Sequence, residues 1–356
     1  MSDTPKPTVQ TVERTEDRFL PSDLFESRSR TQPPRNGTGF IREAARDIPV
    51  YHECDVLVVG GGPSGSALPV VEDGRVTAIL FESKSGRRAL RAKVVIDATG
   101  DGDVFARAGA EFESDIDAGD VHHSMNTGFL IAGVDMDRWI DFRLLQREQF
   151  SDFMQRGRDR LGFFQAPYVS WRKDIALFLG PRQSGLSGLD IDDMTEVEIR
   201  SHRFMATHCD FFRQNAPGFE NAYMLQSGSQ LGVRHTRRLK GVGKVLRAQW
   251  PEGVVLPGEI GVSPSPSPKF PVISVPYEAL VPARLDGLLA CGRHVSSDAS
   301  SHGFLREIPQ CWLTGQAAGA AAAIAANKGV QPRAVDAREI RAALLKQGVF
   351  VREPGT

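Results

Sequence analysis

The stretch that decides the fold is Val56-Leu57-Val58-Val59-Gly60-Gly61-Gly62-Pro63-Ser64-Gly65, four apolar residues followed by a glycine-rich loop. An unbroken apolar run is typical of a strand buried in a parallel sheet. Gly60, Gly62 and Gly65 have the spacing of a dinucleotide fingerprint. Its first glycine allows a tight turn, its second admits a pyrophosphate, and its third lets the next helix pack closely. The motif alone leaves open an ordinary glycine turn after a strand.

Two further glycine-bearing segments follow short apolar runs. The second segment is Asp97-Ala98-Thr99-Gly100-Asp101-Gly102-Asp103, and the third is Cys291-Gly292-Arg293 running on to Gly315-Gln316-Ala317-Ala318-Gly319. In each, the backbone can approach a phosphate or a ring closely. Three such segments in series predict one dinucleotide held by residues from both ends of the chain.

Composition excludes several function classes. The 43 basic and 44 acidic side chains nearly cancel, so no charge imbalance favours nucleic acid or an acidic membrane surface. No apolar stretch is long enough to span a bilayer, and the polar N-terminus does not read as a secretory signal, so we expect no membrane partner and a cytoplasmic location. The four cysteines are widely scattered and predict neither a zinc site nor an iron–sulfur cluster.

The apolar patterns predict an α/β fold with a second, β-rich region. Asp73-Gly74 and Ser85-Gly86 are turn signals of a strand meander. The predicted strands are Val56–Val59, Val76–Phe81, Ala92–Ile96, Phe129–Val134, Ile175–Leu179 and Leu288–Ala290, and the predicted helices are Met194–Asn215, Pro309–Asn327 and Asp336–Lys346.

The span from about residue 51 to residue 350 resembles the FAD-dependent oxidoreductases of the two-dinucleotide-fold flavoprotein superfamily. Within it the chain is most similar to a bacterial branch that includes proteins like the flavin subunit of heterodisulfide reductase. The three glycine segments carry the resemblance, and Leu231-Gly232-Val233-Arg234 with Arg237-Arg238 resembles the branch's substrate-domain signature. The resemblance implies bound FAD, held by Gly60, Gly62, Gly65, Thr99, Gly100, Asp101, Gly292, Arg293, Gly315, Gln316 and Gly319.

The resemblance also implies the domain organisation. Residues 1–50 are polar and rich in proline, and we expect a disordered or extended segment. Residues 51–112 and 281–330 are expected to form a discontinuous, Rossmann-like FAD-binding domain. Residues 113–280 would be an inserted β-rich α+β substrate or cap domain, and residues 331–356 a C-terminal helical tail.

Three further residues are candidates on chemical grounds. Reduced flavin carries negative charge, which Arg306 and the amides at the start of the next helix would stabilise. Arg306 is equally suited to clamp a substrate carboxylate or to pair with a neighbouring acid. Asp298 is suited either to bond a ribityl hydroxyl of FAD or to cap a loop. His302 is a candidate acid or base, the alternative being a structural histidine.

The sequence departs from the family immediately after the glycine loop. Only Ser66, Ala67 and Leu68 precede Pro69, whereas a parallel crossover needs about a dozen residues or more. Glu82 is the one literal candidate for the acid that binds the adenine ribose, but it lies in the meander. We therefore expect that a block of roughly a hundred residues is absent between Ala67 and Leu68. Weakened FAD binding and exposed apolar faces of the sheet would follow.

The leading functional prediction is an oxidoreductase that passes a hydride or electrons between a small organic substrate and bound FAD, with an unidentified electron acceptor or donor. The alternative is a catalytically silent remnant that acts as a binding or assembly module. A dehydrogenase that uses only nicotinamide is less favoured, because it has no use for the segments around Arg293 and Gly315.

Overall fold

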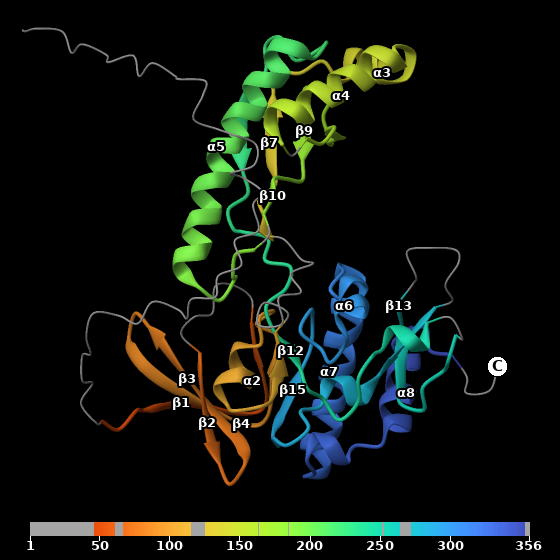
Figure 1. Ribbon diagram of the computed structural model, residues 1–356. Helices are drawn as coiled ribbons and strands as arrows, with labels where there is room; N and C mark the ends of the chain where they lie inside the picture. Colours follow the sequence, from red (N-terminus) through yellow and green to blue (C-terminus); the bar gives the residue numbers. More distant parts are fainter. Residues whose placement is uncertain are drawn as a thin grey trace, which may run out of the picture. The chain divides into compact units, whose positions relative to one another are not determined.

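The computed structural model describes residues 46–60, 67–114, 125–162, 164–183, 185–250, 253–263 and 272–352 (Figure 1). Contacts divide the chain into two compact units. The described part of the first lies in residues 125–186 and 192–232, and the second holds the remainder. Gly62, Gly65 and the predicted N-terminal segment up to residue 45 lie outside the described residues. No helix in the described ranges is both long and apolar enough to cross a bilayer.

A five-stranded sheet organises the second unit. Its strands are β1 (Val50–Val59), β2 (Leu68–Glu72), β3 (Arg75–Ser83), β4 (Gly86–Asp97) and β15 (Leu288–Ala290). β4 is central: β1 runs parallel to it on one side, while β3 pairs with its first half and β15 with its last residues on the other. The predicted strands and meander are confirmed. β4 begins earlier than predicted because its first half pairs with β3 in a polar, partly exposed hairpin.

β1 lies at the edge of this sheet. Among the described residues β1 pairs only with β4, and it leaves Tyr51 72% and Val58 60% exposed. The chain reaches β4 from β1 through the antiparallel β2–β3 hairpin, and only residues 60–67 separate β1 from β2. That connection is too short for a helical crossover of about a dozen residues. Apolar side chains at this edge are therefore exposed, as the sequence leads one to expect.

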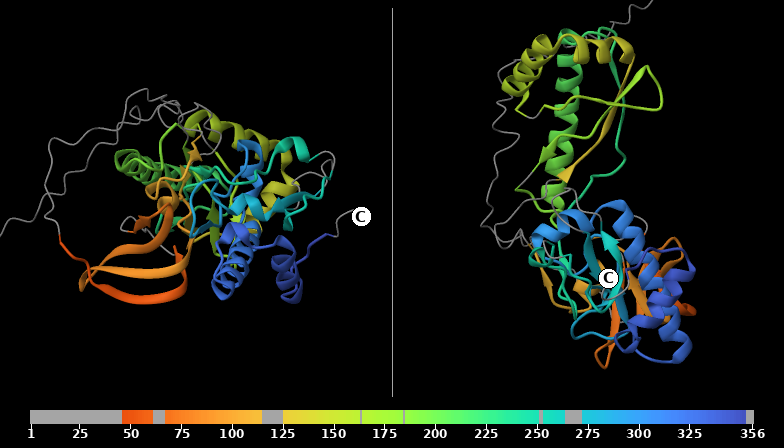
Figure 2. Two further views of the ribbon diagram at one scale, coloured as in Figure 1. Left: turned by 90° about the horizontal axis from the view of Figure 1, so that it is seen from below. Right: turned by 90° about the vertical axis from the view of Figure 1, so that its right-hand side faces the viewer.

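Three helices from the C-terminal part of the chain belong to the second unit, and the longest of them packs against β4, β1 and β15 of the sheet. They are α6 (Ala299–Leu305), α7 (Ile308–Lys328) and α8 (Ala337–Lys346), and α7 and α8 are neighbours in Figures 1 and 2. α7 starts with Pro309 in its first turn and ends at Gly329, which confirms the predicted helix. Its buried alanines let the helix pack closely, because they add little bulk. Asp336 caps α8 by accepting from the Arg338 amide.

Shorter elements complete the second unit. They are α2 (Asp103–Arg107), β5 (Phe112–Glu113), β12 (Arg238–Leu239), β13 (Glu259–Ser263) and β14 (Ile273–Pro276), with 3-10 turns η2 (Arg247–Gln249), η3 (Tyr277–Leu280) and η4 (Pro332–Ala334). β5 pairs with β12 and β13 with β14, both antiparallel. Residues 233–250 and 253–263 thus group with the five-stranded sheet, although the sequence predicts them in the substrate domain. The functional domain boundaries stay a prediction.

The first unit combines an antiparallel sheet with three helices. Its elements are β6 (Met125–Asn126), β7 (Phe129–Ala132), α3 (Met136–Leu145), α4 (Arg147–Leu161), β8 (Tyr168–Val169), β9 (Ile175–Phe178), β10 (Arg182–Gln183), α5 (Ile191–Asn215) and β11 (Tyr223–Ser227). The main sheet has the order β11-β7-β9-β8, and β10 pairs with β6. β7, β9 and α5 were predicted to within a few residues, whereas α3 and α4 were not.

Aromatic side chains fill the core of the first unit. Trp139 of α3 is 1% exposed and lies 5.4 to 5.8 Å, between ring centroids, from five phenylalanines: Phe142, Phe150, Phe153, Phe212 and Phe219. Most of these ring pairs are tilted or edge-to-face, the arrangement that aromatic quadrupoles favour. This core joins α3, α4 and α5 into one body.

Candidate functional site

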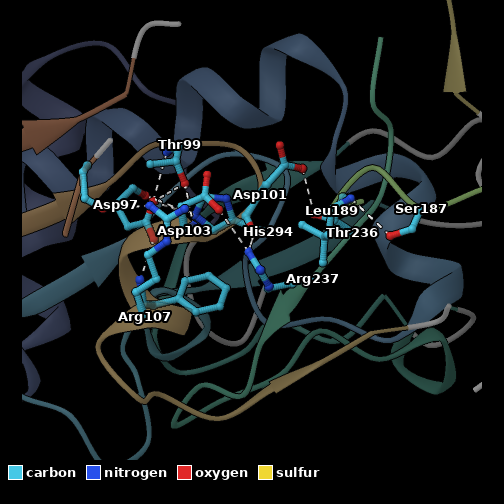
Figure 3. A network of polar contacts seen from close by, with 12 residues as sticks. Asp97, Thr99, Asp101, Asp103, Arg107, Ser187, Leu189, Thr236, Arg237 and His294 are labelled. Atoms are coloured by element: carbon cyan, nitrogen blue, oxygen red, sulfur yellow. Dashed lines mark hydrogen bonds and ion pairs between the residues drawn. The ribbon is translucent and has the colours of Figure 1, made fainter. Parts of the chain in front are cut away.

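Asp97, the last residue of β4, organises the loop that follows the strand (Figure 3). Its side chain is fully buried, and Oδ1 accepts from the Thr99 amide at 3.0 Å and from Thr99 Oγ1 at 2.7 Å. Oδ2 accepts from the Phe105 amide at 2.9 Å. Thr99 Oγ1 in turn accepts from the Asp103 amide, which begins α2. The buried carboxylate thus holds the Ala-Thr-Gly segment in place. A buried charge that has lost its bonds to water is costly without these hydrogen bonds, so any movement that breaks them is unfavourable.

Asp101 joins this segment to the C-terminal one. Its Oδ1 accepts from Arg293 Nη2 at 2.7 Å and from Thr236 Oγ1 at 2.7 Å. Arg237 Nη1 donates to the Asp101 carbonyl and to Asp103 Oδ1. Gly100 has φ 83°, and a Cβ there would lie 2.3 Å from Arg293 Nη1, so only glycine fits. Residues almost two hundred positions apart therefore meet at one ion pair.

The ends of three strands and the start of α7 meet beside these contacts. The Asp97 carbonyl accepts from the Cys291 amide at 2.9 Å and from His294 Nε2 at 3.1 Å. The Gly292 amide donates to Thr314 Oγ1 of α7 at 3.0 Å. At the end of β1, a Cβ on Gly60 would lie 2.4 Å from the Ala98 carbonyl oxygen. Any side chain at this position would therefore clash with the backbone that follows β4.

A cavity of about 560 Å³ opens at this junction. Val58 of β1 lines it, together with Ile96 of β4 and seven of the predicted site residues: Gly100, Gly292, Arg293, Arg306, Gly315, Gln316 and Gly319. The predicted meeting of the two ends of the chain is confirmed. The volume lies within the range of small-molecule and cofactor sites.

The cavity wall is cationic. Among the described residues, Arg293 and Arg306 are the only charged ones that line it, and none of its described lining residues carries a carboxylate. Arg306 Nη2 lies 3.2 Å from Glu307 Oε1, so Arg306 pairs with the neighbouring acid, which was one of its predicted alternatives. Arg306 also lines the cavity. Burial raises the pKa of the Cys291 thiol to about 12 and also raises the pKa of the Cys311 thiol. Both thiols therefore stay protonated, and the wall keeps its positive charge.

The other predicted residues that the structure describes do not line the cavity. Asp298 caps α6: Oδ1 accepts from the Ser301 amide at 2.7 Å and Oδ2 from the Arg247 amide at 2.6 Å. This is the loop-capping alternative, and it occupies both oxygens. Glu82 pairs with Arg87 across the β3–β4 hairpin. Thr99 and Asp101 hold the loop after β4 and the Arg293 side chain in place through the hydrogen bonds described above.

His302 lies in a separate buried cluster. It is 1% exposed, and its ring packs edge-to-face against that of His235 with centroids 4.6 Å apart. Arg238 Nη1 donates to His235 Nε2 at 2.9 Å, and Arg238 Nε donates to the Ser297 carbonyl. Since arginine is always a donor, His235 presents an unprotonated Nε2 here. A role for His302 as acid or base stays a prediction.

Six residues of the wall are not among the predicted site residues. Val58, Ile96, Ala98 and Cys291 belong to the glycine-bearing segments or to the apolar runs before them, whereas Cys311 and Trp312 come from α7. Both precede Gly315, Gln316 and Gly319 by three to eight positions on the same helix. Helical periodicity places residues three, four and seven apart on one face, and this signal would have found Trp312.

Comparison with known proteins agrees with this geometry. A family model described as FAD dependent oxidoreductase matches residues 66–344, which is more than half of the chain. A search of curated proteins finds no match.

Several solved structures are similar. A geranylgeranyl bacteriochlorophyll reductase-like protein from Thermoplasma acidophilum shares 14% identity over 80% of this chain and 51% of that one, with a TM-score of 0.31. The p-nitrophenol 4-monooxygenase PnpA from Pseudomonas putida DLL-E4 shares 11% identity over 79% of this chain and 53% of that one, with a TM-score of 0.34. A myxobacterial chondrochloren halogenase shares 10% identity over 79% of this chain and 50% of that one, with a TM-score of 0.36. The chain spans about half the length of these proteins.

Proposed function

Because the chain belongs to the FAD dependent oxidoreductase family, its cofactor is FAD, and we propose that it passes a hydride or electrons between a small organic substrate and that flavin. The observation that carries the proposal is the single cavity lined by Val58, Gly100, Arg293 and Gly315, which come from both ends of the chain. Bound FAD supplies reversible hydride and electron transfer.

The cavity residues fit the flavin part of FAD. Arg293 and Arg306 place two permanent positive charges on the wall, and Cys311 and Trp312 bring the start of α7, the positive end of the helix dipole, to the same wall. Together they stabilise an anionic group, as the flavin becomes on reduction. Asp101 fixes Arg293 through the 2.7 Å ion pair, so the charge is held in place before a ligand binds. Preorganisation of this kind lowers the cost of binding.

The adenosine part of FAD has fewer partners. We infer that the crossover helix and the second strand are missing after the glycine loop. The edge position of β1, which pairs only with β4 among the described residues, supports this inference. The acid expected to bind the adenine ribose has no counterpart near the cavity, because Glu82 pairs with Arg87 in the hairpin. FAD affinity is therefore reduced, and most of what remains comes from the flavin half.

The unpaired β1 edge favours one alternative, a catalytically silent binding or assembly module. Such a module would still bind FAD through the cavity but would not exchange electrons with a substrate. The electron acceptor or donor stays unidentified.

Thermal unfolding with and without cofactors tests the proposal. We expect added FAD to raise the melting temperature of the purified protein, because a ligand that binds only the native state stabilises it by about 2.7 kcal/mol at a hundredfold excess over Kd. NADH alone should leave it unchanged. Reduction of the bound flavin by a panel of small organic donors, followed in the visible spectrum, then separates the oxidoreductase from the silent module. A melting temperature that no flavin raises would contradict both.

A further inference from the structure

Trp312 is unusual among the residues that line the cavity. Its side chain is 72% exposed, whereas Trp250 in the same unit is 4% exposed. Tryptophan is highly buried on average in folded proteins, so a largely exposed indole on the wall of a cavity leaves apolar surface available to a ligand. Fixed on a 21-residue helix, the indole is a rigid apolar face that needs a partner.

The helix surface beside Trp312 is bare. Gly315 and Gly319 follow it by three and seven positions and line the same cavity. Apart from the nearby backbone of α7 itself, no heavy atom of the described residues lies within 4 Å of a Cβ built on either glycine. A flat group can therefore lie against the backbone of α7 next to the indole. Val58, which is 60% exposed, supplies a further apolar surface in the same cavity.

The charges around the indole select the kind of flat group. Arg293 and Arg306 favour a ring system that carries negative charge, and none of the described residues that line the cavity is acidic. Adenine is neutral, whereas the isoalloxazine ring becomes anionic when it is reduced. Stacking on an aromatic face suits either ring, but of the two rings only reduced isoalloxazine is itself an anion that the arginines stabilise.

We propose that Trp312 holds the isoalloxazine ring of FAD by stacking on it, over the surface left open by Gly315 and Gly319. This inference rests on the proposed function, because it needs flavin in the cavity. It goes further by naming the side chain that contacts the ring. It also predicts that the ring alone, without the adenosine half, carries the interaction.

Tryptophan fluorescence tests this directly. In a Trp171→Phe protein, Trp312 is the only strongly exposed tryptophan among the described residues. We expect riboflavin and FAD to quench its emission, and ADP to leave it unchanged. Trp312→Leu should weaken riboflavin binding about 3- to 10-fold, the value of an aromatic pair, and Trp312→Phe should retain most of the affinity.

A matched control separates stacking from general surface effects. Trp171 is 77% exposed and lies in the other unit, so Trp171→Leu should leave flavin affinity unchanged. If Trp312→Leu binds riboflavin as tightly as the parent protein, the stacking role is wrong while the proposed function stands. Quenching by ADP would assign the position to adenine and overturn the inference. If no flavin binds the parent protein at all, the proposed function fails and the stacking role fails with it.

Discussion

Gly315→Leu is expected to weaken flavin binding about 10- to 100-fold while the protein without flavin stays folded. Apart from the nearby backbone of α7 itself, no atom of the described residues lies within 4 Å of a Cβ at this position, so the new side chain can be accommodated there. It enters the cavity, and overpacking of a binding surface costs about 1–3 kcal/mol. Leucine is also a better helix former than glycine by several tenths of a kcal/mol. Stability and binding should therefore change in opposite directions.

The measurements are the melting temperature without flavin and a flavin titration on the same samples. Ala323→Leu is the matched control, since Ala323 is exposed on the same helix and does not line the cavity. It should leave flavin affinity unchanged. A Gly315→Leu protein that binds flavin like the parent would show that the ligand lies elsewhere.

Acidification should destabilise the first unit through His208. Five phenylalanine rings surround this fully buried side chain at 5.0 to 5.8 Å between centroids: Phe129, Phe164, Phe178, Phe204 and Phe212. Burial lowers its pKa from 6.5 to about 3. Between these two values the unfolded chain binds a proton that the folded unit does not, so stability is complete above pH 6.5 and falls as the pH drops. The slope is about 1.4 kcal/mol per pH unit, or about 2–3 kcal/mol lost at about pH 4.5.

Urea unfolding at several pH values, followed by circular dichroism, measures this loss. His208→Leu should flatten the pH dependence, because no imidazole remains to be protonated on unfolding. His202→Gln on the same helix is the control. The His202 side chain is 55% exposed, and its removal should leave the slope nearly unchanged. An unaltered slope in His208→Leu would mean that carboxyl groups, and not this histidine, set the acid sensitivity.

Local pattern was sufficient to predict the elements that build the site. β15 and α7 have dense apolar runs next to a glycine or a proline, so their bounds are marked in the sequence, whereas for β1 only the end at Gly60 is marked and its start at Val50 was not predicted. α3 and α4 were missed for the opposite reason. In α4 the anchoring Phe150 and Phe153 stand among charged residues, and their burial depends on rings of other helices.

The site itself could be predicted only in outline. The glycine segments correctly indicated that Gly100, Arg293 and Gly315 meet, because close backbone approach leaves a local trace. The side-chain partners left no such trace. Asp101 pairs with Arg293, which lies 192 positions later in the chain, and Asp298 accepts hydrogen bonds from the Ser301 and Arg247 amides. Such pairings depend on tertiary contacts between distant residues, and the roles of these side chains toward FAD remain predictions.

Hydrogen exchange with and without FAD tests the central claim, that both ends of the chain form one cofactor site. We predict slower amide exchange on FAD binding in peptides that cover residues 56–60, 96–102, 291–293 and 308–319 at the same time. Peptides of the first unit should be unaffected. Protection confined to one end of the chain, or found only in the first unit, would contradict the account.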